Sequence, residues 1–362
     1  MFAQIIKTGQ LKLWSGYKRK LRDKHPLSYL FWECTMNCNF FCKHCGSSAG
    51  RKTFPGQLST VEIIRVFREI GRDFYPKNIM IAVTGGEPLV RKDLFEVMKY
   101  ASHLGFYWGM VTNGYLVNPD VVRKMKETGM NTISISIDGI GQTHDSFRNM
   151  KKAYDHAISA VRLLVAARFL KTVQITTVVH RGNISQLEEM YRIFSGLGID
   201  SWRVINVDPI GRAETNRGLL LKGSQFKYLL DFIKSRRESS KFEVTYGCSG
   251  FLGLQYENEV RNGFFICRTG IDTASILYNG DIFVCPNVER RKEFIQGNVR
   301  HDRFSEIWNN KFKYFRLNNR TANTDCLKCE FWEDCLGGPF HLWDSEKSKP
   351  KFCHTELLKF PN

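Results

Sequence analysis

The sequence lacks any apolar run of about 18 residues, so it predicts no membrane-spanning helix. Residues 1–10 have neither the apolar core nor the small-residue cleavage site of a secretory signal peptide. Glycine-rich phosphate loops, helix-turn-helix patterns and zinc-finger spacings are missing as well, which argues against sequence-specific nucleic-acid binding. With 43% hydrophobic and 25% charged residues, the composition is typical of a globular protein. We expect a cytoplasmic location.

Acidic residues are scarce beside basic ones. The chain has 36 Asp and Glu against 53 Lys and Arg, a formal net charge of +17. Such a surface favours an acidic partner, which can be a peptide, a nucleic acid or an anionic membrane face.

Cysteine, in contrast, is abundant. There are 11 cysteines, an odd number, and no secretory leader, so metal binding is favoured over a disulfide framework. Cys38, Cys42 and Cys45 have the spacing C-x3-C-x2-C, with no fourth cysteine in the pattern. A [4Fe-4S] cluster held by three thiolates keeps one iron without a protein ligand, where a small chelating molecule can bind and receive an electron. Zinc, with Cys34 or His44 as a fourth ligand, is the alternative that the triplet alone leaves open.

The triplet follows a predicted strand over residues 27–32 and resembles the signature of radical S-adenosylmethionine (SAM) enzymes. The resemblance implies that the amino and carboxylate groups of SAM chelate the open iron. It further implies that an electron from the cluster cleaves SAM to a 5′-deoxyadenosyl radical, which abstracts a substrate hydrogen. An external electron donor such as flavodoxin or ferredoxin is part of the same expectation.

Strand and helix patterns alternate through the first half, which predicts a parallel sheet. The predicted strands are 27–32, 79–84, 107–112, 132–137, 173–179 and 202–207, and the predicted helices are 60–71, 93–105, 119–129, 153–168 and 184–197. Six such units make an α/β fold, the (β/α)6 partial TIM barrel of the resembled family. Ligand-binding groups are expected at the carboxyl ends of the strands.

Four segments at these strand ends resemble the SAM-binding motifs of the family: a GGEP, a TNG, a SISIDG and an arginine ten residues further on. The resemblance assigns cofactor binding to His44, Gly85, Gly86, Glu87, Asn113, Ser134, Ser136, Asp138 and Arg148. Glu87 is expected to accept from the SAM ammonium group. Arg148 is expected to pair with the SAM carboxylate, because its planar fork of donors suits a carboxylate. His44 takes the position that packs near adenine in the family.

The second half holds seven more cysteines, most of which resemble a SPASM domain with two auxiliary [4Fe-4S] clusters. The expected metal ligands are Cys248, Cys267, Cys285, Cys326, Cys329, Cys335 and Cys353, so the chain is expected to bind three [4Fe-4S] clusters in all. A zinc ribbon is the alternative on spacing alone. Cys34 is expected to be a buried small residue instead of a ligand.

One departure from the family pattern concerns the first auxiliary cluster. The family continues with a further cysteine where this chain has Pro339, which cannot bind iron. The first auxiliary cluster then depends on Cys267, Cys285 and Cys248, and our hypothesis is that one of its irons is open. Cys248 lies 19 residues before Cys267, a wider gap than in the family.

The predicted organisation is a basic extension (1–26), a radical SAM partial barrel (27–213), a helical bridge (214–246) and a SPASM domain (247–362). The basic stretch 7–24 has apolar residues among its lysines and arginines. A helix packed on the barrel is favoured there over an interfacial helix on a membrane surface.

The resemblance implies an oxidoreductase that abstracts a hydrogen from a peptide or protein side chain, in a post-translational modification or maturation. Residues 28–34 and 45–48 also resemble SPASM proteins paired with small lipoproteins. Sulfatase maturation is disfavoured, because Pro286 occupies the position of the aspartate base of those enzymes. The alternatives are a radical SAM dehydrogenase acting on a small molecule and a zinc-stabilised binding protein without catalysis. The catalytic base, the substrate and the product are not assigned.

Overall fold

One ten-stranded sheet runs through the protein in the order β10-β9-β8-β1-β2-β3-β4-β5-β6-β7. The structure is a computed structural model that describes residues 2–52, 54–317 and 320–359. Residue 1 of the predicted extension and residues 360–362 of the predicted SPASM domain lie outside the described residues. No helix in the described ranges is long and apolar enough to cross a membrane.

The eight strands from β8 through β1 to β7 are parallel and form a curved sheet. Strands β9 and β10 extend this sheet beyond β8 with antiparallel pairing. Its strands are β1 (Tyr29–Thr35), β2 (Met80–Gly85), β3 (Tyr107–Thr112), β4 (Thr132–Ser136), β5 (Thr172–Val179), β6 (Ser201–Asn206), β7 (Glu243–Tyr246), β8 (Thr273–Ile276), β9 (Asp281–Phe283) and β10 (Gly297–Asn298). A separate two-stranded sheet pairs β11 (Trp343–Asp344) with β12 (Lys349–Pro350).

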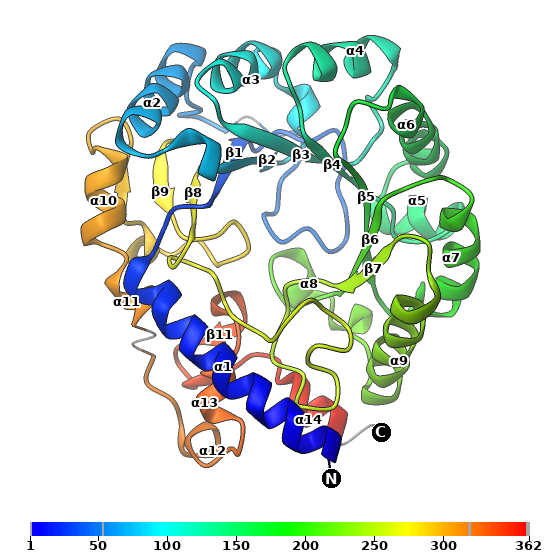
Figure 1. Cartoon of the computed structure of the whole chain (residues 1–362). Coiled ribbons are helices and arrows are strands. Elements are labelled where there is room, and N and C mark those ends of the chain that lie inside the picture. The colour runs from blue at the N-terminus through cyan, green and yellow to red at the C-terminus, as the bar shows by residue number, and fades with distance from the viewer. Residues whose placement is uncertain (1, 53, 318–319, 360–362) are drawn as a thin grey trace.

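Helices follow most of the parallel strands and form an outer ring around the sheet (Figure 1). The helices of the first two thirds are α1 (Phe2–Lys24), α2 (Thr60–Asp73), α3 (Leu94–His103), α4 (Pro119–Glu127), α5 (Gln142–Arg148), α6 (Ala153–Ala167), α7 (Leu187–Ser195), α8 (Arg212–Thr215) and α9 (Gly223–Ser239). The remaining ones are α10 (Phe304–Asn310), α11 (Lys313–Arg316), α12 (Thr324–Leu327), α13 (Trp332–Cys335) and α14 (His354–Lys359). Short 3-10 turns lie at 76–78, 88–90, 184–186, 217–219, 292–294 and 340–342.

The main core lies between the ring of helices and the sheet. Side chains at alternate strand positions, such as Ile81 and Val83 of β2, are completely buried there against apolar helix residues such as Phe67 of α2. Local sequence signals set the ends of the helices. Helix α2 begins with a capping box in which Ser59 and Glu62 bind each other's backbone N–H groups.

The predicted α/β partial barrel is confirmed. The six predicted strands and the helices between them are all present, and their ends lie within three residues of the predicted ones. The Asn279-Gly280 pair, a sequence typical of hairpins, lies in the turn that joins β8 to β9, with Gly280 at a φ of +90°.

Three features differ from the prediction. The predicted bridge contains β7, which pairs in parallel with β6 and extends the barrel sheet. Strand β8, within the predicted SPASM domain, pairs in parallel with β1 on the other side, so the two predicted domains share one sheet. Helix α1 lies across the cysteine-rich C-terminal part instead of on the barrel: Trp14 packs on Phe264, and Lys18 forms an ion pair with Asp334 (Figure 1).

Candidate active site

The loop that carries the cysteine triplet leaves the carboxyl end of β1 and is tied to distant parts of the chain. The Lys43 N–H donates to the carbonyl of Phe147 over 3.0 Å. Arg212 donates from Nε to the Cys42 carbonyl over 2.7 Å and from Nη1 to the Ala49 carbonyl over 2.9 Å. The Arg212 guanidinium also lies 4.0 Å from the centre of the Phe41 ring. One arginine at the start of α8 therefore binds two separate points of the loop.

The three thiols of this loop face the same region. Burial, with a contribution from the neighbouring thiols of Cys42 and Cys45, raises the pKa of Cys38 to about 12. Burial likewise raises the pKa of Cys42 to about 11, against the lowering effect of Arg148. Thiols with such pKa values are protonated at neutral pH, so a bound metal has to displace their protons.

The glycine pair after β2 makes room for the cysteine loop. Gly85 has a φ of +134°, and a Cβ there would lie 2.1 Å from the Thr35 carbonyl oxygen. A Cβ on Gly86 would lie 2.1 Å from the carbonyl oxygen of Asn37. Only glycine fits at these two positions, because the backbone at the end of β1 and the start of the cysteine loop passes too close to leave room for a side chain.

Glu87 connects the GGEP segment to the TNG segment. Its buried carboxylate accepts from Thr112 Oγ1 (2.7 Å) and from the backbone N–H groups of Leu89 (3.1 Å) and Asn113 (2.8 Å). Burial raises the pKa of Glu87, while these three donors act in the opposite direction. The Asn113 side chain in turn donates to Asn39 Oδ1 in the cysteine loop over 2.8 Å. Glu87 and Asn113 therefore lie beside the loop that carries the cysteine triplet.

Asp138 and Arg148 form a buried ion pair at the same end of the sheet. Arg148 donates from Nε to Asp138 Oδ2 over 2.6 Å, and its Nη1 lies 3.9 Å from the Cys42 sulfur. Asp138 Oδ1 accepts from the Val178 N–H over 2.8 Å. The guanidinium that was predicted to bind the SAM carboxylate is thus partly engaged within the protein, and Nη2 is the nitrogen without a hydrogen bond to the described residues.

His44 is one of three stacked rings. It lies parallel to Phe147 with ring centres 4.2 Å apart, and Phe147 stacks on His180 at 3.9 Å. Burial lowers the pKa of His44 to about 3, so its imidazole is neutral at physiological pH. A neutral, stacked ring fits a packing role better than proton transfer.

The two serines of the SISIDG segment are in different surroundings. Ser134 Oγ hydrogen-bonds to Thr176 Oγ1 (2.7 Å) and accepts from Gln174 Nε2 (3.0 Å) in the interior of the barrel. Ser136, two residues closer to the carboxyl end, is buried and makes no side-chain hydrogen bond with the described residues. Ser136 is the better placed of the two for a ligand at the carboxyl ends, because the Ser134 hydroxyl is already engaged deeper in the barrel.

Cys248, Cys267 and Cys285 form a second group, although 37 positions separate the first from the last. Burial raises the pKa of Cys248 to about 11 and that of Cys285 to about 12, and in both cases a neighbouring thiol of this group contributes to the increase. Cys248 is exposed, whereas Cys267 and Cys285 are half-buried. The chain thus brings the distant Cys248 to the other two cysteines.

The third group consists of the four remaining cysteines of the C-terminal part: Cys326, Cys329, Cys335 and Cys353. Burial raises the pKa of Cys335 to about 12, and the nearby Cys353 adds to the shift. Burial also raises the pKa of Cys326, and the nearby thiols of Cys353 and Cys329 contribute to that increase.

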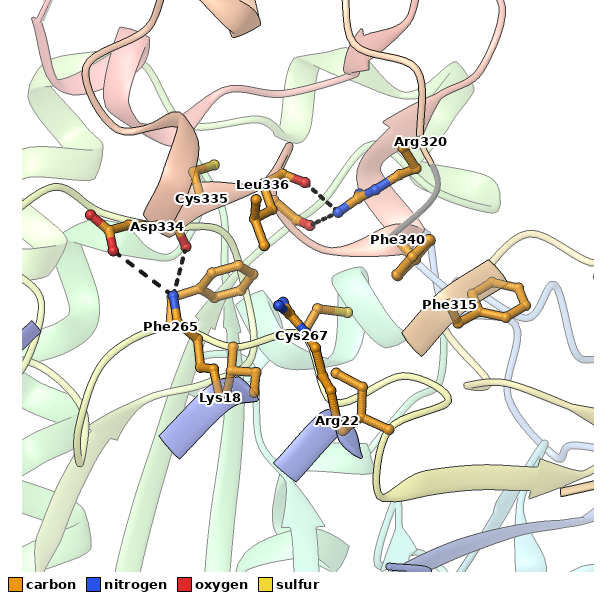
Figure 2. A pocket seen from close by; sticks show the side chains of 13 residues that line it. Lys18, Arg22, Phe265, Cys267, Phe315, Arg320, Asp334, Cys335, Leu336 and Phe340 are labelled. Carbon is orange, nitrogen blue, oxygen red and sulfur yellow. Dashed lines mark hydrogen bonds and ion pairs between the residues drawn. The ribbon is translucent and has the colours of Figure 1, made fainter. Parts of the chain in front are cut away.

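A cation-lined cavity separates the second and third groups. Figure 2 shows Cys267 and Cys335 on its wall, with Lys18 and Arg22 entering from α1 and Arg320 from the opposite side. Arg320 donates from Nη2 to the carbonyls of Leu336 and Gly338, the latter over 3.0 Å. Positive groups next to cysteine thiols favour the thiolate form in which cysteine binds metal.

Cysteine thiolates bind both zinc and iron–sulfur clusters. Among the described residues, no three His, Cys, Asp or Glu side chains converge closely enough to hold a single metal ion. A cluster of four irons spreads its thiolate ligands more widely than one ion does. The predicted metal ligands are thus present in three separate sets, and Cys34 lies in the apolar core as predicted, with no exposed surface.

Sequence reasoning missed three residues around the cysteine loop. Arg212 lies next to the predicted end of the barrel at residue 213 but was not assigned to the site, and neither was His180. Arg290 forms an ion pair with the buried Glu33 and contacts the sulfur of Met36 over 3.3 Å. No local signal marks these residues: Arg212 lies 170 positions from Cys42 and Arg290 lies 254 from Met36, and His180 reaches the loop through Phe147, which stacks on His44.

Comparison with known proteins agrees with this geometry. Residues 32–194 match the radical SAM superfamily, and residues 267–330 match the iron–sulfur cluster-binding domain SPASM. The AdoMet-dependent heme synthase of Oleidesulfovibrio alaskensis is 29% identical over 95% of this chain and 91% of its own length. The mycofactocin maturase MftC of Mycobacterium tuberculosis is 31% identical over 85% of this chain and 77% of its own.

Solved structures share the fold at lower identity. The enzyme anSMEcpe with bound AdoMet superimposes with a TM-score of 0.72 at 18% identity, covering 92% of this chain and 95% of its own. Streptococcus suis SuiB bound to S-adenosylmethionine gives a TM-score of 0.68 at 19% identity, covering 87% and 74%. From the motifs, the cysteine groups and these relationships, the chain belongs to the radical SAM superfamily and is an enzyme of its SPASM-containing branch.

Proposed function

We propose that this enzyme abstracts a hydrogen atom from a side chain of a peptide or protein and so modifies or matures it. The main support is the arrangement of the cysteines: a three-cysteine loop at the carboxyl ends of the strands, followed by two further groups in one chain. When bound, the clusters and SAM supply the electron and the 5′-deoxyadenosyl radical. The protein's own residues hold these groups in place.

The residues that would hold the first cluster are Cys38, Cys42 and Cys45, on the loop that Arg212 fixes. Glu87, Asn113, Ser136 and Arg148 surround the position expected for SAM. The buried Asp138 keeps the Arg148 guanidinium oriented toward the loop. The two further groups would hold the auxiliary clusters, and the cations between them favour thiolate ligands.

The peptide substrate is supported by relatives that cover most of the chain. MftC is named as a maturase, and structures of the same fold contain SuiB with precursor peptide SuiA and anSMEcpe with a peptide. A second candidate is a small-molecule substrate. It is favoured by the heme synthase relatives, one of which aligns over 95% of this chain.

Anaerobic reconstitution with iron and sulfide, followed by iron counting and a SAM-cleavage assay with dithionite, tests the chemistry. We expect about twelve irons per chain, from three clusters of four, and release of 5′-deoxyadenosine. The Cys42→Ser variant should lose the release. Zinc in place of iron, or no SAM cleavage, would contradict the proposal.

The substrate class can be tested with extracts of cells grown in deuterated medium. The extract is split by size, and each fraction is added to the enzyme with unlabelled SAM. Deuterium in 5′-deoxyadenosine from the large fraction, lost after protease treatment, supports a peptide or protein. Deuterium only from the small, protease-resistant fraction supports the second candidate and rejects the first.

A further inference from the structure

Arg203 is a cation inside the barrel that none of the site residues described above uses. It lies in β6, with Thr176 of β5 and Thr245 of β7 as its neighbours in the sheet. Its guanidinium makes no hydrogen bond and no ion pair with the described residues, and its Nε is buried without a partner. Burial lowers the pKa of Arg203, and only Tyr29 and Cys248 act against that shift.

The side chain lines a cavity that six successive strands enclose. The cavity has a volume of about 190 Å³, and its wall includes Tyr29 of β1, Gly109 of β3, Thr132 of β4 and Gln174 of β5. Most of its polar groups are neutral hydroxyls and amides. Arg203 is the charged residue of the lining.

Small residues on three neighbouring strands create this space. Ala82 of β2, Gly109 of β3 and Ser134 of β4 all contribute to the wall. At Gly109 a Cβ would lie 2.2 Å from Thr132 Oγ1, so a larger side chain there would intrude on this wall. The barrel is therefore left hollow at the level that Arg203 faces, instead of being filled by side chains as barrel interiors commonly are.

Such a cation is costly unless something pairs with it. Arg203 is half-buried, and a charge that is largely removed from water without a partner destabilises a folded protein, since such charges are normally paired. The acidic groups in and near the barrel already have partners: Asp138 pairs with Arg148, and Glu33 pairs with Arg290. An unpaired guanidinium beside an open cavity is typical of an anion-binding site.

We infer that Arg203 binds a carboxylate group on an arm of the substrate, which enters the hollow of the barrel. A guanidinium presents two parallel donors that match the two oxygens of a carboxylate. The volume is below the range of about 300–1,000 Å³ for sites that hold a whole small ligand. The cavity therefore suits an acidic side arm, while the rest of the substrate lies outside it. This inference rests on the proposed function, since it names a chemical feature of the same enzyme's substrate.

The test uses the anaerobically reconstituted enzyme with SAM bound and without a reductant. Binding of glutarate is measured by calorimetric titration, with glutaramide as the uncharged match of the same shape. N-acetylglutamate amide, which presents the same carboxylate on a peptide unit, is titrated in parallel. Tighter binding of this compound than of glutarate indicates a peptide source of the carboxylate, and the reverse order indicates a small molecule.

The Arg203→Met variant removes the positive charge. The Arg203→Lys variant keeps the charge but lacks the two parallel N–H donors of the guanidinium. Arg181→Met is the matched control, because Arg181 is an exposed arginine beyond the end of the neighbouring β5. We expect wild type and the Arg181 variant to bind the carboxylates alike and glutaramide not at all. Arg203→Met should bind carboxylates at least tenfold more weakly, with Arg203→Lys between the two. Without ligand, Arg203→Met should melt at a higher temperature than wild type, since the unpaired charge is gone.

Two results would overturn the inference. One is a wild-type enzyme that binds neither carboxylate. The other is an Arg203→Met enzyme that binds them normally but melts earlier and loses iron, which would make Arg203 the counter-charge of a cluster at Cys248. Neither result depends on SAM cleavage, so a failure of the proposed function would be seen separately, in the 5′-deoxyadenosine assay.

Discussion

The Arg148 guanidinium lies between the Asp138 carboxylate and the Cys42 sulfur. Its Nε donates to Asp138 Oδ2 over 2.6 Å, and its Nη1 is 3.9 Å from the Cys42 sulfur. Asp138 has no exposed surface, and Arg148 is almost as deeply buried. The end of α5 is thereby joined electrostatically to the cysteine loop, although 106 positions separate Arg148 from Cys42.

Replacement of Asp138 by Asn should leave the Arg148 charge buried and unpaired. Removing one partner of a buried ion pair costs about 3–5 kcal/mol. We expect a loss of about 3 kcal/mol in the free energy of unfolding, measured by anaerobic urea titration. The double variant Asp138→Asn/Arg148→Met should lose less than the single one, because no unpaired cation is left. A single variant as stable as wild type would show that solvent reaches this pair.

Arg212→Gln should weaken the hold on the cysteine loop without unfolding the barrel. The substitution removes two charge-assisted hydrogen bonds to the Cys42 and Ala49 carbonyls, and such bonds contribute about 1.5–3 kcal/mol each. We expect iron of the triplet cluster to be released to a chelator at least about tenfold faster, which corresponds to about 1.4 kcal/mol. Arg51→Gln is the matched control, because Arg51 also binds a loop carbonyl, that of Asn39, but from an exposed position. Equal release rates in the two variants would contradict the role given to Arg212.

His144 should make the protein less stable as the pH falls below neutrality. Burial, followed by the charge of Arg148, lowers the pKa of His144 to about 4, against about 6.5 for an unfolded histidine. Between these values the unfolded chain binds a proton that the folded chain does not, so stability decreases as the pH falls. From pH 7.5 to 5.5 the expected loss from this one residue is about 1 kcal/mol.

The His144→Gln variant tests this origin. Glutamine can still accept from the Asp138 N–H, which binds His144 Nδ1 in the native protein over 2.9 Å. Urea titrations at the two pH values should therefore show a smaller pH effect in the variant than in wild type. An identical pH effect in both proteins would place its origin in other groups.

The sequence predicted those parts of the fold that local patterns determine. Strand β3 begins and ends at the predicted residues, because a continuous apolar run is bounded there by clear turn signals. Strands β7 and β8 were missed as barrel strands. Tyr29 of β1 pairs with Thr273 of β8 across 244 positions, and no local periodicity reveals which strand takes an open edge.

The site was predictable to the extent that motifs carry it. The resemblance to SISIDG assigned Ser134, Ser136 and Asp138 to the site together. It gave no information on depth, so it did not distinguish Ser134, which is bound within the barrel, from Ser136 near the end of the strand. Arg203 and Arg212 resemble ordinary polar positions of a strand and a loop. Their environments depend on segments far away in the sequence.

Cys248 and Cys34 give the sharpest test of the cysteine groups, since both were uncertain ligands on spacing alone. Cys248 lies with Cys267 and Cys285, whereas Cys34 is fully buried as part of the main apolar core. We expect Cys248→Ser to lose about four irons per chain, because a cluster with two remaining cysteines is poorly held. Cys34→Ser should keep all its iron but unfold at lower urea concentration, because a hydroxyl then lies buried in the core. Full iron content in the Cys248 variant would mean that another donor completes the first auxiliary cluster, and the hypothesis of an open iron held by three cysteines would then fail.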